Sequence, residues 1–435
     1  MFRVRSDFHR TRLAIAALFC FLGFQYATWT SRLPALTSRL DLSAQELGLL
    51  LMACGVGAAA SFPLVSALMR RLGSRRLAFV SALSLAVLLP ALYLAPNYPV
   101  ALVVICCDGV AAGGLNVAMN AQGSALEVRH GRTTMAQLHA TFSAGSLAAA
   151  LLASGASLFT TSLTAHFLAA TAVLALLLGY SRPRLLTDEP ATGERATDGP
   201  ATDERASDER ATGAPASGDE APKRETERRR GPVLPSRATL WMGLAMVFGT
   251  VTEGAMNDWS ALYMEDVVHA SPQLVPMGIA VVSVMMVVAR LVADGWRSRW
   301  GDARVVRYGS ALAGTGLALA LLTGGVLPTL VGFACVGLGV AAVTPCVYVA
   351  AAAQGPEALS LVAATGTTGL LAGPALIGFV AGATSLVWGM AVVAASALAV
   401  SLCATRVRWR TPETPETPET PEPPGTGPAQ AAPAR

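Results

Sequence analysis

Charged residues are scarce in this chain of 435 residues: they make up 14% of it, against roughly 25% in a soluble domain. Only one of the 32 basic residues is a lysine, and the arginines sit in loops rather than in one cluster, which gives no sign of nucleic-acid binding. All seven cysteines lie in apolar runs without metal-ligand spacing. This composition excludes a disordered, collagen-like or disulfide-stapled protein.

Motifs of catalysis are also missing. The sequence contains no HExxH, no metal cluster and no nucleophile beside a base, and its glycines form no phosphate loop after a strand. We therefore expect no enzyme activity, no metal and no cofactor. Without an ATP-binding motif, any uphill work of this protein has to draw on ion or solute gradients.

Apolar residues are abundant, at 53% of the chain, and the mean hydropathy is +0.50. A helix needs about 20 apolar residues to cross the hydrocarbon of a bilayer. The sequence predicts an all-α integral membrane protein with twelve spans, near 13–31, 46–68, 77–95, 99–121, 136–158, 163–180, 238–263, 274–296, 305–323, 327–350, 361–383 and 386–404.

The arginine distribution predicts the orientation. With the N-terminus inside, 29 basic residues fall in cytoplasmic segments, two fall outside and one lies within a span. Cytoplasmic loops carry such an excess of Lys and Arg. We expect a multi-pass protein of the bacterial plasma membrane with both termini in the cytoplasm.

The spans fall into two halves separated by a polar segment. We expect a short cytoplasmic tail (1–12), a first six-helix bundle (13–181) and a second bundle (238–405). Between the bundles, 182–237 is rich in charge with crude repeats, and 406–435 begins with Thr-Pro-Glu repeats. Both polar segments lack the apolar surface needed for folding, so we expect disorder in both. We expect a monomer.

The two halves resemble each other, which indicates an internal duplication. Four landmarks of the first half recur in the same order in the second half, with almost constant spacing. The pairs are Gly73 with Gly301, Gly109 with Gly337 and Gly145 with Gly373, each 228 residues apart, and Trp29 with Trp259, 230 apart. Two pseudo-symmetric six-helix bundles with a site between them are typical of rocker-type secondary transporters.

The loop motifs carry a family resemblance. The segment 290-RLVADGWRSRWGDAR-304 keeps Arg290, Asp294 and Gly301 of the signature between the second and third helices of the major facilitator superfamily. The first copy, 66-SALMRRLGSRR-76, keeps Gly73. The fragments WTSRLP, AMNAQG, HATFSAGS and EGAMNDWSALYM resemble bacterial permeases related to fucose permease. The resemblance implies the MFS fold, transport by alternating access and a cytoplasmic gate at the signature.

Two acidic residues lie deep in predicted spans. Asp108 and Glu253 both fall near the middle of the membrane at 1.5 Å per residue, where an ionised side chain is costly. No Arg or Lys is expected at comparable depth. Both are candidates for proton coupling, although each is also explained as a structural carboxyl bonded to a neighbouring helix. In fucose permease-like proteins a carboxylate on the first helix takes part in coupling; here Gln25 stands there instead.

Other polar side chains of the spans are candidates for substrate binding. They share i, i+4 spacing or a place beside such a row, and amide groups suit hydroxylated solutes. The candidates are Gln25, Trp29, Asn116, Asn120, His139, Asn257 and Trp259. The alternatives are helix–helix hydrogen bonds for the amides, interfacial positions for the tryptophans, and packing or an inner gate for His139.

Two pairs are candidate gates. Arg32 and Asp258 fall near the outer ends of repeat-related helices and are expected to form an extracellular latch. Arg290 and Asp294 are i, i+4 near the inner end of the eighth span.

Three functions remain open at this point. The first is a proton-coupled transporter of a small polar, for example sugar-like, solute. The second is an exporter of a drug-like or secondary metabolite by proton antiport. Drug antiporters typically carry a glycine–proline motif on the fifth helix. In this chain the fifth helix lacks it and the motif occurs in 369-GLLAGPALIG-378, which argues modestly against drug export. The third is a membrane sensor or scaffold that does not transport.

Overall fold

The computed structural model describes residues 2–130, 134–159, 162–187, 236–407 and 409, and these residues fold almost entirely into helices. The first half contains α1 (Phe2–Thr30), α2 (Leu33–Leu40), α3 (Ala44–Ala60), α4 (Phe62–Leu94), α5 (Tyr98–His130), α6 (Met135–Phe159), α7 (Leu163–Ser181) and η1 (Arg182–Arg184). The second half contains α8 (Arg237–Asp266), α9 (Met277–Trp300), α10 (Asp302–Thr323), α11 (Val326–Val340), α12 (Val343–Ala352), α13 (Pro356–Ala383) and α14 (Leu386–Ala404).

These helices confirm the twelve predicted spans. Within the described residues, nine helical segments are long and apolar enough to cross a membrane. Helices α8 and α9, and α3 continued by the start of α4, supply the other three. The chain differs from the prediction in detail: α1 begins at Phe2, and the tenth span is divided into α11 and α12. Most of the predicted linker and C-terminal tail lies outside the described residues.

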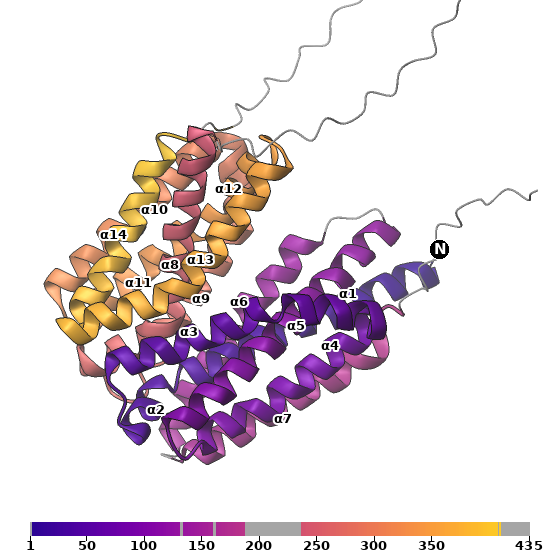
Figure 1. Ribbon diagram of the computed structural model, residues 1–435, viewed down its shortest axis with the longest axis horizontal. Coiled ribbons are helices and arrows are strands. Elements are labelled where there is room, and N and C mark those ends of the chain that lie inside the picture. The colour runs from indigo at the N-terminus through magenta and orange to yellow at the C-terminus, as the bar shows by residue number, and fades with distance from the viewer. Residues whose placement is uncertain (1, 131–133, 160–161, 188–235, 408, 410–435) are drawn as a thin grey trace, which may run out of the picture.

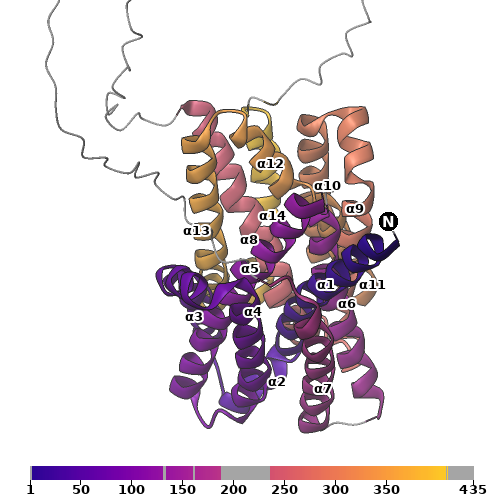
Figure 2. The ribbon, with the colours of Figure 1, turned by 90° about the vertical axis from the view of Figure 1, so that its right-hand side faces the viewer.

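The helices form two bundles, α1–α7 and α8–α14 (Figures 1 and 2). We call the end that carries Asp7, Ser181, Arg237 and Ala404 the terminal end, and the opposite end the far end. Figure 1 shows the bundles meeting towards their far ends and diverging towards their terminal ends. The molecule is therefore open on one side only.

The predicted duplication is visible in the backbone. A Cβ atom on Gly109 of α5 would lie 1.9 Å from the Cys54 carbonyl oxygen of α3, and one on its counterpart Gly337 would lie 2.5 Å from the Val282 carbonyl oxygen of α9. The fourth helix of each half therefore approaches the second through a glycine, as small residues allow in membranes.

Gly73 and Gly301 also adopt matching conformations. Their φ/ψ angles are 76°/167° and 79°/153°, a region that is essentially restricted to glycine. Each ends the second span of its bundle and lets the chain turn into the third.

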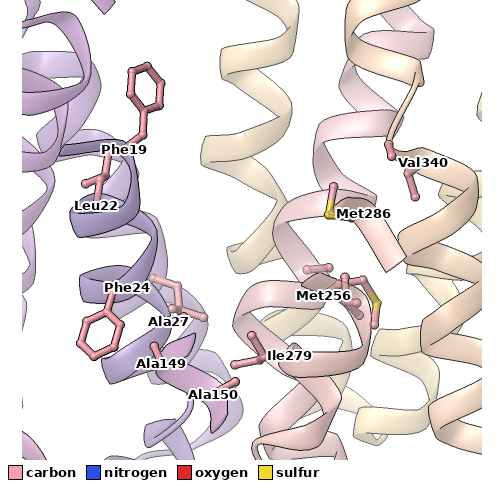
Figure 3. Close-up of a cluster of buried hydrophobic side chains, with 14 of the residues drawn as sticks. Phe19, Leu22, Phe24, Ala27, Ala149, Ala150, Met256, Ile279, Met286 and Val340 are labelled. Atoms are coloured by element: carbon pink, nitrogen blue, oxygen red, sulfur yellow. The ribbon is translucent and has the colours of Figure 1, made fainter. Parts of the chain in front are cut away.

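Small side chains build the interface between the bundles. Helix α3 packs on α13. A Cβ atom on Gly48 of α3 would lie 3.0 Å from the Gly378 Cα atom of α13. Helix α6 packs on α9, and Figure 3 shows Ala149 and Ala150 beside Ile279. All three of these apolar side chains are fully buried. Small residues thus let the two bundles pack closely at both places.

We predict that Gly145→Val lowers the melting temperature and the yield of folded protein. A Cβ atom there would lie 2.2 Å from the Cys20 carbonyl oxygen, so α1 and α6 would have to separate, which costs about 1–3 kcal/mol. Gly155→Val is the matched control on the same helix, because a Cβ atom there meets nothing within 4 Å. Equal melting temperatures of the two variants would contradict this packing.

Candidate functional site

Helix α1 holds a buried carboxyl group of its own bundle. The Gln25 side-chain amide donates a hydrogen bond of 2.7 Å from Nε2 to Oδ1 of Asp108 on α5. Gln25 and Asp108 are 1% and 3% exposed, and the Gln25 Oε1 and Asp108 Oδ2 atoms have no hydrogen-bond partner. A protonated carboxyl group would supply the donor that these two acceptor atoms lack.

The next residue of α1 reaches into the other bundle. The Tyr26 hydroxyl donates a short hydrogen bond to Oδ1 of Asp258 on α8. Asp258 is 4% exposed, and the Tyr26 ring stands edge-on to Trp29 with 5.2 Å between ring centroids. Adjacent residues of α1, Gln25 and Tyr26, therefore bond to a carboxyl group of each bundle.

A second link between the bundles centres on a guanidinium group. Arg290 of α9 forms an ion pair of 3.1 Å, Nη2 to Oε1, with Glu253 of α8. Its Nη1 donates a hydrogen bond of 2.7 Å to the Ser143 hydroxyl of α6 in the other bundle. The two charged side chains are about a quarter exposed, so this link faces an accessible space rather than the core.

The ion pair corrects the expectation that Glu253 has no basic partner at its depth. Helix α9 continues to Trp300, beyond the predicted end of its span, so Arg290 lies near the middle of the helix rather than near its inner end. Arg290 pairs with Glu253, one helix away. The side chain of Asp294 lies outside the described residues, so the gate predicted at Arg290 and Asp294 stays a prediction.

The expected latch between Arg32 and Asp258 is also wrong for this conformation. Arg32 turns back into its own bundle, where it donates to the Ala153 carbonyl oxygen at 3.0 Å and to the His166 ring at 3.4 Å. Arg32 lies just beyond the end of α1, at the start of α2, whereas Tyr26 lies within α1, and it is the Tyr26 hydroxyl that reaches Asp258. At this place the two bundles are therefore joined by a hydrogen bond between a phenol and a carboxyl group, not by an ion pair.

The remaining polar candidates lie on α5, α6 and α8. Asn116 and His139 are exposed, and Asn120 is partly so. Asn120 bonds to the Asn116 side chain at 2.6 Å, and the His139 ring packs edge-on against Phe19 at 4.9 Å. Asn257 bonds to the backbone of Glu253. The hydrogen bonds of these three asparagines thus stay within single helices, unlike that of Gln25.

Both repeat-related tryptophans are buried. Trp29 is 2% exposed and Trp259 fully buried, so neither occupies a membrane interface. The indole N–H group of each has no hydrogen-bond partner, which is unusual for a buried tryptophan. Their predicted role as walls of a solute site stays a prediction.

The sequence analysis did not identify two residues of the site, Tyr26 and Ser143. Tyr26 directly follows Gln25, and a phenol beside an amide in the middle of a span could have indicated a polar site. Ser143 lies one turn after His139 within the fragment HATFSAGS. Neither sequence position by itself names its partner, because both partners belong to the opposite half of the chain.

The geometry shows two bundles joined by polar contacts and second helices that end at glycines, and sequence comparison decides the family. A sequence model described as Major Facilitator Superfamily matches residues 13–357. The chain belongs to the major facilitator superfamily. It is accordingly a membrane transporter that resides in a lipid bilayer and acts on a small-molecule substrate.

Relatives of this MFS chain are similar along most of its length. An uncharacterised transporter of Sinorhizobium fredii is 32% identical over 86% of this chain and 91% of its own. An uncharacterised MFS-type transporter of Yersinia pestis is 28% identical, over 91% and 94%. The membrane protein MosC of Rhizobium meliloti is 27% identical, over 86% and 85%.

Solved structures agree on the MFS fold. Two crystal structures of the nucleoside transporter NupG superpose with TM-scores of 0.65 and 0.63, covering 92% and 91% of this chain and 99% and 98% of theirs. Their sequence identity is 14%, so the likeness concerns the fold alone.

We predict that Glu253 and Arg290 are energetically coupled. Glu253→Gln or Arg290→Gln alone leaves one charge unpaired and lowers the melting temperature, whereas the double variant recovers much of the loss. The coupling free energy should be about 1 kcal/mol, since the pair is partly exposed. Thermal unfolding of the four proteins measures it. Additive effects of the two substitutions would show that the pair does not hold the site together.

Proposed function

We propose that this protein is a secondary active transporter that moves a small polar solute by alternating access, coupled to protons. The observation that carries the proposal is the placement of two buried carboxyl groups, Asp108 and Asp258, on the two sides of α1. A carboxyl group buried in a membrane protein is costly and needs a functional reason.

The conformation supports entry of the solute from the terminal end. The bundles diverge there, while Tyr26 with Asp258, and Ser154 with the Gln273 carbonyl oxygen at 2.6 Å, join them towards the far end. The arginine-rich loops lie at the terminal end, which we assign to the cytoplasm of a bacterial inner membrane. The described conformation is then inward-open.

The walls of the opening suit a polar solute. Asn116 and Asn120 offer amide donors and acceptors, and His139 adds an aromatic nitrogen donor or acceptor. Deeper in, the Arg290–Glu253 pair is accessible enough for a solute to compete for either charge. We infer that solute binding loosens this pair and with it the Arg290–Ser143 link between the bundles.

Protons act through the hydrogen bond between Tyr26 and Asp258. An ionised Asp258 accepts the Tyr26 hydrogen bond strongly and keeps the far end closed; protonation weakens the bond and lets the far end open. Asp108, bonded only to a neutral amide, exchanges its proton when the site opens to water. Glu253, predicted to carry a proton, instead serves as the solute-sensitive partner of Arg290. These roles make proton binding and bundle rotation interdependent.

The test uses purified protein in liposomes that contain a pH-sensitive dye. Sugars, sugar acids, small metabolites and hydrophobic cations are added outside one at a time, without an initial pH gradient. Internal acidification by one solute indicates symport, and we expect Asp108→Asn and Asp258→Asn to reduce it about tenfold or more, because one buried proton site is lost. Asn97→Ala, at the exposed N-terminus of α5, is the control that keeps the signal.

The other outcomes separate the alternatives. Alkalinisation would indicate proton antiport and would make the protein an exporter. Solute uptake without any pH change, retained in both aspartate variants, would overturn proton coupling while leaving transport intact. A flat response together with no ligand-dependent rise in melting temperature across the panel would contradict transport and favour a sensor or scaffold.

A further inference from the structure

The outer surface of the second bundle carries a groove that transport does not explain. It encloses about 420 Å³ between α9, α10 and α11. Its lining is mainly apolar and aromatic and includes Trp296, Tyr308, Leu312 and Leu338. A volume of this size lies within the range of small-molecule sites.

The sequence builds this groove from glycine and tryptophan. At its floor α10 and α11 touch through their backbones: a Cβ atom on Gly339 would lie 2.2 Å from the Gly309 carbonyl oxygen. Beside the floor, Trp296 and Trp300 are i, i+4 on α9 and stack with 6.1 Å between ring centroids. The groove lies where two large indole rings stand beside two glycines, which have no side chain to fill the space between them.

The groove opens away from the solute path. Tyr308 and Leu312 are 64% and 41% exposed, and Trp300 is 48% exposed. In Figure 2 the first bundle leaves the outer side of α9 and α10 uncovered. In a membrane these exposed apolar side chains face lipid, at the level of the terminal end.

Positive charge surrounds the mouth of the groove. Arg304 lines it, and Arg299 and Arg307 are exposed in the same stretch of chain. The Arg307 guanidinium lies 5.9 Å from the centroid of the Tyr308 ring. Asp302, the nearest acid in sequence, already pairs with Arg297 at 2.8 Å. An apolar hollow with a cationic rim is complementary to a molecule that has a hydrocarbon chain and an anionic head.

The internal repeat supplies a comparison within the molecule. A shift of 228 residues places Arg76 at the position of Arg304, but Leu68 at that of Trp296 and Val80 at that of Tyr308. The first bundle therefore keeps the charge without the aromatic walls. The aromatic groove is a property of the second bundle.

We propose that this groove binds an anionic phospholipid, with an acyl chain against Trp296 and Leu312 and the phosphate on Arg304. Basic pockets between transmembrane helices on the cytoplasmic side are suited to such lipids. Because the groove lies on α9, the helix that carries Arg290, a bound lipid stabilises the second bundle beside the solute site. The proposal does not depend on the nature of the solute.

Quenching of tryptophan fluorescence by brominated acyl chains tests the proposal. The protein is reconstituted into phosphatidylcholine vesicles that contain the same minor share of brominated phosphatidylglycerol or of brominated phosphatidylcholine. We expect about a fivefold preference for the anionic lipid per arginine engaged, seen as stronger quenching. The Trp296→Phe and Trp300→Phe variants identify the part of the signal that comes from the groove, because both indoles line it.

Two variants separate the groove from general attraction to the membrane. Arg304→Gln removes the rim charge and should abolish the preference, while Arg76→Gln, its counterpart in the first bundle, should keep it. Leu312→Phe fills the groove and should reduce quenching by both lipids. Melting temperatures close to that of the unsubstituted protein confirm that each variant is folded. Equal quenching by both lipids, or an equal loss in Arg76→Gln and Arg304→Gln, would overturn the proposal.

Discussion

The hydrocarbon of a membrane offers no water to a carboxyl group, and this constraint organises the centre of the molecule. Asp108 and Asp258 come from different bundles, and each has a hydrogen bond from adjacent residues of α1, Gln25 and Tyr26. One helix therefore supports both buried acids. The Tyr26–Asp258 bond also joins the two bundles, so the proposed proton coupling rests on this one contact.

The rest of the fold makes a change of that contact possible. Glycine at repeat-related positions lets helices approach within each bundle, which keeps each bundle rigid. Glycine on the facing surfaces of the two bundles lets α3 and α13 approach closely, as at Gly48 and Gly378. Rigid halves tied by a few polar links favour rotation over deformation, and rotation opens one end as it closes the other.

Much of this architecture is predictable from the sequence, and the reasons are physical. Span length, arginine position and the 228-residue repeat follow from bilayer thickness and duplication, and they predicted the twelve helices and the matching turns at Gly73 and Gly301. The contacts of the site were not predictable, because they depend on where helices face one another. No basic partner was expected for Glu253, yet Arg290 of another helix reaches it and also reaches Ser143 on a third. Likewise Arg32 was expected at the same membrane depth as Asp258, but its side chain points into its own bundle, towards Ala153 and His166.

The most direct test of the account is the distance between the bundles as a function of pH. Spin labels are attached to cysteines introduced at two exposed pairs, positions 71 and 353 at the terminal end and 99 and 385 at the far end, in a variant without the seven native cysteines. The account predicts that acidification lengthens the far-end distance and shortens the terminal-end distance, and that Tyr26→Phe or Asp258→Asn produces the acid distances at neutral pH. The control Tyr93→Phe should behave as the parent does. Distances that do not respond to pH, or respond equally in Asp258→Asn, would contradict the claim that this carboxyl group couples protons to the movement of the bundles.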